Sequence, residues 1–384
     1  MKNDIRESNI ELLKVIAVFM IVLCHTGISM TYTASGHSTA AWFYDINSLP
    51  NSLEKFILTL INYCGYLGND IFFICSAWFM VDRKHSHKSK ILKMESDVWI
   101  ISVLYLAVFV VCGIHVQRST VIRALLPTAF NNNWFASAYM FFYAFFPLLN
   151  HCFERIPRGC QKYGCIVFAV SACFVLPFLL DVFKFRFSIS YPMMWVVAYC
   201  CVSYLKTYHR KLLDSRKFAI VVLLIGISGL IGEIAATYYF GPGIRLFHGD
   251  GMRWNKCYNL FEWFFAFGCF NLVRTFQFHS LLINRISSLS LLIYLIHGNF
   301  LVRRHVRPYL YNIIHYHLHD RNIPLWLLMF SILIFIASAL LAYLYQKSIQ
   351  KIAYQIADNS CNAVAGHMRK HIRFEKVRHA REHA

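Results

Sequence analysis

The sequence has few charged residues: Asp, Glu, Lys and Arg together make up 15% of its 384 positions. A typical soluble protein carries about a quarter. Acidic residues are the scarcer kind, with 19 against 38 Lys and Arg. Charge is low because long segments carry none, and several approach the roughly 18–20 apolar residues that cross a bilayer as a helix. An ordinary soluble fold is therefore excluded, and lipid is the expected solvent of most helices.

Other absences narrow the possible functions. The 13 Cys include no C-x-x-C pair and no zinc-finger spacing, and many lie inside apolar runs, so no metal site is expected. The first apolar run is not followed by a small-residue cleavage site, which argues against a cleavable signal peptide. The net charge is +19, but the basic residues form short clusters between apolar runs, so no nucleic-acid partner is expected.

Apolar runs bounded by charged and turn residues predict an all-α membrane bundle of about ten transmembrane helices. No change of composition marks a second globular domain. We therefore expect a transmembrane domain over 1–346 and a basic cytoplasmic tail over 347–384. The expected spans are 10–30, 56–81, 97–116, 134–150, 165–181, 189–205, 218–240, 258–273, 286–302 and 325–346.

The distribution of basic residues predicts the orientation. With a cytoplasmic N-terminus and ten spans, 25 Lys and Arg fall on the inner side and 12 on the outer side, and Lys14 lies within a span. This excess agrees with the positive-inside rule. An odd number of spans would put the basic tail outside. We expect both termini to be cytoplasmic, and a multi-pass protein of the cell (inner or plasma) membrane, surrounded by lipid.

The first span carries two notable polar residues, Lys14 and His25, which are eleven positions apart. Eleven steps of about 100° make three turns plus about 20°, so both side chains leave the same helix face, about 16 Å apart along the axis. Polar groups in lipid usually face a cavity or the bundle interior. The alternative is that Lys14 reaches lipid phosphate and His25 is a structural interfacial histidine.

Four segments, in order, resemble acyltransferase family 3, the membrane-bound O-acyltransferases that modify surface glycans. The family's first helix has an Arg, ten residues and a His, where this chain has Lys14 and His25. The other three are GYLGNDIFFICSAWFM at 65–80, NWFASAYMFFYAFFPLLN at 133–150 and SSLSLLIYLIHGNF at 287–300. They resemble the family's second helix, its Trp-led helix ending in Pro-x-x-Asn, and its late Tyr-x-x-His helix. The resemblance covers roughly residues 9–346.

The sequence departs from the family pattern in three places. Lys14 stands where the family has Arg, so the charge is kept but the planar fork of the guanidinium is lost. Ala77 replaces the usual Gly after Ser76. The family's Arg-x-x-Arg after the second helix becomes Lys90-x-x-Lys93. These changes bear on how closely the substrates are held.

The resemblance implies transfer of an acyl group, most simply acetyl, from cytosolic acyl-CoA to a hydroxyl of a surface or lipid-linked glycan. It implies that His25 is catalytic, either as the base or as a transient acyl carrier. Lys14, Lys90 and Lys93 would meet the phosphates of the donor. For Lys90 and Lys93, ordinary positive-inside topology is an equal explanation. No bound cofactor is expected, since acyl-CoA is a co-substrate.

Five further side chains are candidates for a substrate contact or for a structural role: Asp70, Ser76, Trp134, Glu262 and His297. Carboxyl groups inside a span are costly and often functional, but a structural pairing explains them as well. Trp134 would suit stacking on a sugar, although a Trp at a membrane boundary ordinarily belongs to the aromatic belt.

A multi-helix transporter or exporter of a small anion or a glycan-related solute is the alternative function. Ionisable residues within spans would also suit a permeation path. Against it, the sequence has no evident internal repeat and no Gly/Pro-interrupted helices in matching positions.

Overall fold

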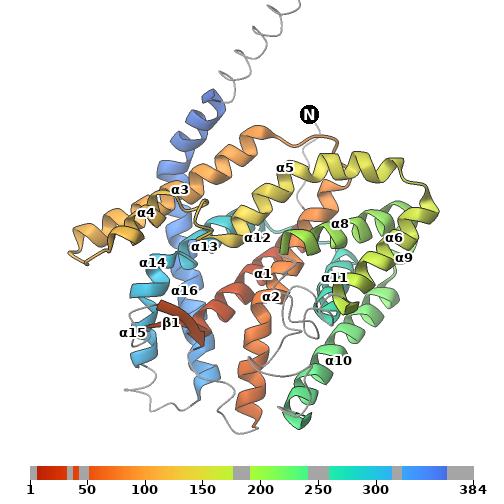
Figure 1. Ribbon diagram of the computed structural model, residues 1–384, viewed down its shortest axis with the longest axis horizontal. Helices are drawn as coiled ribbons and strands as arrows, with labels where there is room; N and C mark the ends of the chain where they lie inside the picture. The colour runs from red at the N-terminus through yellow and green to blue at the C-terminus, as the bar shows by residue number, and fades with distance from the viewer. Residues whose placement is uncertain are drawn as a thin grey trace, which may run out of the picture.

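The computed structural model describes residues 7–32, 38–42, 52–175, 191–240, 259–313 and 322–360. This part of the chain is almost entirely helical, with one short β-hairpin (Figure 1). The first half contains α1 (Ser8–Gly27), β1 (Ile28–Tyr32), β2 (Ser38–Trp42), α2 (Leu53–Met80), α3 (Lys88–Val111), α4 (Arg118–Leu125), α5 (Trp134–Arg155), α6 (Arg158–Val170) and a π-helical turn (Ser171–Val175). The second half contains α8 (Tyr191–Tyr208), α9 (Arg210–Leu213), α10 (Arg216–Phe240), α11 (Leu260–Arg274), α12 (Leu281–Ser288), α13 (Ser290–His297), α14 (Phe300–His305), α15 (Arg307–Asn312), α16 (Ile323–Tyr345) and a π-helical turn (Gln346–Gln350).

Helix α1 lies inside the bundle and contacts α2, α11, α12, α13 and α16 (Figure 1). Two glycines of α2 allow its close approach to α1. A Cβ at Gly68 would lie 2.5 Å from the carbonyl oxygen of Ala17, and one at Gly65 would lie 2.5 Å from Cys24 Sγ. Small residues at such positions let two membrane helices pack backbone against backbone. The first two helices therefore form a tight pair at the centre of the fold.

The outside of the bundle is strongly apolar. Large hydrophobic side chains stay exposed along α3, α10 and α16, and Val111 and Leu340 are 87% and 61% exposed. An apolar surface of this extent suits lipid and not water. Within the described ranges, five helices are long and apolar enough to cross a membrane: Ser8–Gly27, Leu53–Met80, Ser89–Val111, Arg216–Ala236 and Ile323–Ser360.

Each of the ten expected spans overlaps a described helix, and five of these helices are long and apolar enough to cross a membrane. The other expected spans fall on α5, α6, α8, α11 and the run α12–α14. Residues 176–181 of the expected fifth span, 189–190 of the sixth and 258 of the eighth lie outside the described part of the chain. The ten-span count and the cytoplasmic placement of both termini remain predictions.

Three boundaries differ from those expected. Helix α3 begins at Lys88 and not near 97, so Lys90 and Lys93 lie in helix and not in a loop. The expected span 286–302 is broken into α12, α13 and α14, with the second break at Gly298 and Asn299. The side chain of Asn299 caps α14 by accepting a hydrogen bond from the Leu301 N–H. Lastly, α1 ends at Gly27, before the expected end of the first span at 30, and a β-hairpin follows it where no strand was expected. Strands β1 and β2 are antiparallel and pair Ile28 with Trp42.

The last helix continues to Ser360, so the first part of the expected tail is helical. It is held against α3 by the buried carboxylate of Asp97. This group accepts hydrogen bonds from Tyr345 Oη at 2.9 Å, Gln350 Nε2 at 3.0 Å and Tyr354 Oη at 2.7 Å. Residues 361–384 of the expected tail lie outside the described part of the chain.

Candidate active site

Helix α1 is unbroken from Ser8 to Gly27, so Lys14 and His25 lie on one rigid rod. Eleven residues correspond to about 16 Å of helix. Lys14 lies in the second turn and His25 in the last turn. One helix therefore connects a cation near its beginning with an imidazole near its end.

His25 contacts His297, the last residue of α13. The Nδ1 atom of His25 lies 3.0 Å from Nε2 of His297, and the ring centroids are 5.2 Å apart. His297 is buried, whereas His25 is only partly buried. The fold thus brings together two candidates that are 272 positions apart in the sequence.

The hydrogen bonds of this pair define which nitrogen of His25 is reactive. His297 Nδ1 lies 2.7 Å from the carbonyl oxygen of Ile293. A carbonyl only accepts, so Nδ1 of His297 carries the proton, and Nε2 of a neutral His297 is an acceptor. His25 must then donate from its own Nδ1. This leaves Nε2 of His25 with a free lone pair, as a base or a nucleophile requires.

Arg307 binds the backbone of both histidines. Its Nη1 donates to the carbonyl oxygen of His25, and its Nη2 donates to that of His297 at 3.0 Å. Both carbonyls belong to the last turn of a helix, where the intrahelical partner is missing. Arg307 therefore fixes the end of α1 against the end of α13. Arg307 lies between the expected spans 286–302 and 325–346, where a basic residue is ordinary, so the sequence did not single it out.

Two of the three predicted donor-binding lysines lie near each other at the beginning of α1. Lys14 Nζ forms an ion pair with Glu11 at 2.8 Å. Lys90 Nζ lies 4.3 Å from the ring centroid of Tyr143 and within electrostatic range of Lys14. A cation over an aromatic face keeps its charge available to a further ligand. The fold therefore brings these two lysines to the same end of α1, and their part in donor binding stays a prediction.

Lys93 faces a different neighbour. Its Nζ forms an ion pair with Asp358 at 2.7 Å and lies 5.3 Å from the ring centroid of Tyr354, both on the continuation of α16. The contact gives Lys93 a structural role between α3 and the last helix. Its part in donor binding stays a prediction.

Ser76 and Trp134 take local positions. Ser76 Oγ donates to the Phe72 carbonyl oxygen at 3.1 Å, within α2. Trp134 begins α5 and meets Phe135 edge to face, with ring centroids 5.8 Å apart. Phe135 in turn lies 5.5 Å from Tyr294, one turn before His297. A row of aromatic rings thus connects Trp134 with the histidine pair.

The family model described as an acyltransferase domain matches residues 7–344, nearly the whole chain. The chain belongs to this acyltransferase family. The resemblance to acyltransferase family 3 is thereby confirmed, and the protein is a membrane acyltransferase. No curated protein and no solved structure matches it. The matched range contains both histidines, Arg307 and the three lysines.

The acyltransferase also buries two carboxyl groups away from the histidines. Asp70 on α2 and Glu262 in the first turn of α11 are fully buried, and none of their carboxyl oxygens has a hydrogen-bond partner among the described residues. Glu262 lies within electrostatic range of Asp70 and Glu233. Glu233 accepts a hydrogen bond from Asn259 Nδ2 at 2.6 Å. The fold therefore gathers these acids from α2, α10 and α11, and their roles stay predictions.

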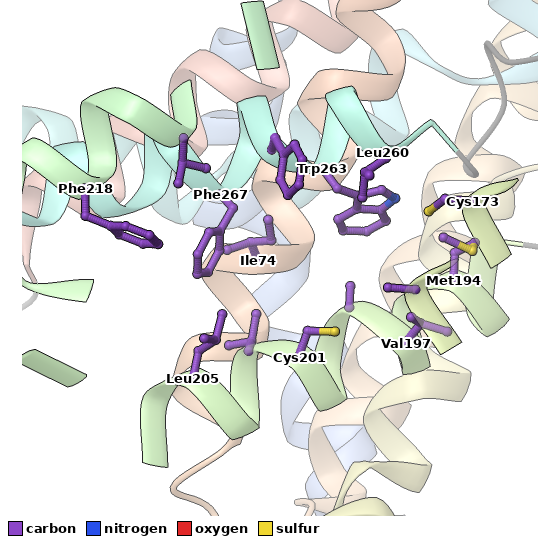
Figure 2. A pocket seen from close by; sticks show the side chains of 15 residues that line it. Ile74, Cys173, Met194, Val197, Cys201, Leu205, Phe218, Leu260, Trp263 and Phe267 are labelled. Atoms are coloured by element: carbon purple, nitrogen blue, oxygen red, sulfur yellow. The ribbon is translucent and has the colours of Figure 1, made fainter. Parts of the chain in front are cut away.

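An apolar cavity of about 270 Å³ lies between α2, α8, α10 and α11 (Figure 2). Its lining includes Ile74, Met194, Trp263 and Phe267, whose side chains point into the space. The residues that line it include no histidine, lysine or carboxylate. The cavity suits an apolar chain and offers no base, which leaves the histidine pair as the better candidate for the chemistry.

Proposed function

We propose that the protein is an O-acyltransferase, most simply an O-acetyltransferase, of the cell membrane. It takes the acyl group from cytosolic acyl-CoA and transfers it to a hydroxyl of a surface or lipid-linked glycan. The observation that carries this proposal is the His25–His297 contact inside an acyltransferase domain. The contact leaves a free imidazole nitrogen on a partly exposed side chain, which suits a base for a hydroxyl.

The reaction needs one proton to be moved twice. Nε2 of His25 takes the proton of the acceptor hydroxyl as that oxygen attacks the thioester carbonyl. The resulting imidazolium donates from Nδ1 to Nε2 of His297, which stabilises the charge. Collapse of the tetrahedral intermediate breaks the carbon–sulfur bond, and the thiolate of CoA receives the proton. In the second form of the mechanism, Nε2 attacks the thioester carbonyl itself, the carbon–sulfur bond breaks and the thiolate of CoA leaves. The acceptor hydroxyl then attacks the acyl-imidazole, the carbon–nitrogen bond breaks, and the hydroxyl proton passes to the thiolate.

Lys14 and Lys90 supply the charge for the donor. In acyl-CoA the pantetheine arm separates the thioester from the phosphates. If the thioester lies at His25, the phosphates must lie at a distance from His25. Lys14 also lies at a distance from His25, toward the other end of α1. Lys14 stands in place of the family's Arg, and a point charge suffices to attract a phosphate.

The test is the rate at which purified protein consumes acetyl-CoA in the presence of a glycan acceptor. His25→Ala should lower turnover by about 10²–10⁴, since this is the usual contribution of a general base. His115→Ala is the matched control, because His115 is exposed beyond the end of α3 and should leave turnover unchanged.

A His25→Ala protein that keeps more than about a tenth of normal turnover would contradict the catalytic role, given the magnitude expected for a base. Comparison of cell-surface glycans with and without the protein then identifies the acceptor. Glycans of identical acyl content would argue against the proposed acceptor class, and acetyl-CoA consumption without any glycan would do the same.

A further inference from the structure

Two arginines lie beside the histidine pair: Arg307 is the first residue of α15, and Arg303 belongs to α14. Arg307 is 4% exposed and donates to the carbonyl oxygens of His25 and His297. Arg303 makes a long hydrogen bond from Nη2 to the Asn132 carbonyl oxygen at 3.4 Å. Its Nε is buried and has no hydrogen-bond partner among the described residues. Part of the Arg303 guanidinium is therefore available to a ligand.

The charge of Arg303 is not balanced by a carboxylate among the residues that the structure describes. The phenol of Tyr294 is the side chain that acts on the Arg303 guanidinium electrostatically, and it supplies no negative charge while it is protonated. Burial, followed by repulsion from Arg303, lowers the pKa of Arg307 to about 9, so this guanidinium stays protonated at neutral pH. A half-buried guanidinium that has an unpaired N–H and lies beside a second cation is costly unless an anion joins it.

An anion at this place cannot be the phosphates of the acyl donor. Arg307 contacts the backbone of His25 itself, and His25 is where the thioester must react. The pantetheine arm keeps the donor's phosphates away from the thioester, and Lys14 and Lys90 lie toward the opposite end of α1. The remaining substrate is the acceptor.

We propose that Arg303, supported by Arg307, binds an anionic group of the acceptor, a phosphate or a carboxylate, close to the hydroxyl that receives the acyl group. This inference rests on the proposed function and narrows it to acidic or phosphate-linked glycans. The guanidinium fork matches both anions, because two parallel N–H donors meet two oxygens. Binding the acid would orient the neighbouring hydroxyl toward Nε2 of His25.

The experiment measures binding without any donor, in purified full-length protein in a nonionic detergent. Glucose 1-phosphate and glucuronate are the two probes, and glucose is the uncharged control, all at equal ionic strength. The readout is the rise of the unfolding temperature with ligand concentration, which gives Kd. At least one acidic probe should bind, glucose should not, and the better probe identifies the anion as phosphate or carboxylate.

Arg303→Gln should weaken binding of that probe by about ten- to a hundredfold, as expected for one lost charge-assisted contact. Arg285→Gln is the matched control, because Arg285 is an exposed arginine of α12. If Arg303→Gln does not fold, Arg303→Lys carries the test, with a weaker but measurable Kd. The unfolding temperature without ligand reports folding separately.

Three outcomes would overturn the inference. In the first, the acidic probes bind no better than glucose. In the second, both Arg303 variants bind the probe as tightly as the normal protein does. In the third, free CoA competes with the probe, which would show that the site binds the donor. None of these measurements needs turnover. Loss of the proposed function would instead appear as failure to consume acetyl-CoA, with anion binding intact.

Discussion

Replacing His297 by leucine removes the Nε2 atom that lies 3.0 Å from His25 Nδ1 and keeps a side chain of branched, apolar shape. His25 retains its Nε2 lone pair in the variant, so the base itself is present. What is lost is the acceptor for Nδ1–H, both in the resting state, where it selects the tautomer, and in the imidazolium state. His297 is thus a positioning residue whose effect passes through His25.

The magnitude follows from the bond that is lost. A hydrogen bond to a charged group contributes about 1.5–3 kcal/mol, and about 1.4 kcal/mol corresponds to a factor of ten in rate. His297→Leu should therefore lower kcat by about ten- to a hundredfold. The KM for acetyl-CoA should stay nearly constant, because the lysines predicted to bind the donor lie toward the other end of α1.

A conservative variant separates this mechanism from a packing effect. In His297→Gln the amide oxygen can take the place of Nε2 as the acceptor, so kcat should recover part of the loss. Release of the CoA thiol, measured at saturating acceptor, gives kcat and KM for each variant. Unfolding temperatures in detergent show whether the leucine variant is folded.

The reasoning is refuted if His297→Leu keeps kcat within about threefold, well below the expected effect of a charge-assisted bond. It is also refuted if leucine and glutamine give equal kcat at equal unfolding temperature, or if the loss lies in the KM for acetyl-CoA.

Two other predictions concern parts of the fold farther from the histidines. Lys14→Arg should keep activity, whereas Lys14→Met should raise the KM for acetyl-CoA about ten- to a hundredfold with little effect on that of the acceptor; an unchanged donor KM would exclude a donor-binding role. Asp97→Leu should lower the free energy of unfolding by at least about 1–3 kcal/mol, because it leaves buried donors of Tyr345, Gln350 and Tyr354 unpaired. The control Asp358→Ala removes only a half-exposed ion pair and should cost about 0–1 kcal/mol, so equal unfolding temperatures for the two variants would contradict this account.

The positions of the helices could be predicted because long apolar runs have one stable form in lipid. The ends of the helices were harder to predict, because a helix can begin with an amphipathic turn that precedes its apolar run. Lys88, Lys90 and Lys93 begin α3 in this way. The last helix likewise passes the expected boundary at 346, because its polar residues Gln350 and Tyr354 bind the buried Asp97 of α3. That partner is about 250 residues away in the sequence.

The candidate site was only partly accessible to sequence reasoning. Helical periodicity and the family resemblance select His25 and Lys14, because both belong to one continuous helix. The same resemblance names His297 but gives no reason to place it against His25. Arg303 and Arg307 contribute to the positive charge of an expected outer loop, where charge is ordinary. Only the fold shows that Arg307 is buried against the histidines and that Arg303 lies beside it.

The break in the expected ninth span accounts for much of the site's geometry. In a continuous helix through 286–302, the His297 carbonyl oxygen would accept an intrahelical hydrogen bond from the N–H four residues later. Because α13 ends at His297, that carbonyl lacks this intrahelical bond. The chain turns after Gly298, and Arg307 donates a hydrogen bond to the carbonyl instead. The end of α1 offers the carbonyl of His25 in the same way. Two helix ends thus meet at one guanidinium, and the side chains at those ends, the two imidazoles, are held in contact as a consequence. In a membrane such irregular backbone persists only where protein satisfies it, so Arg307 stabilises the break that places His297 against His25.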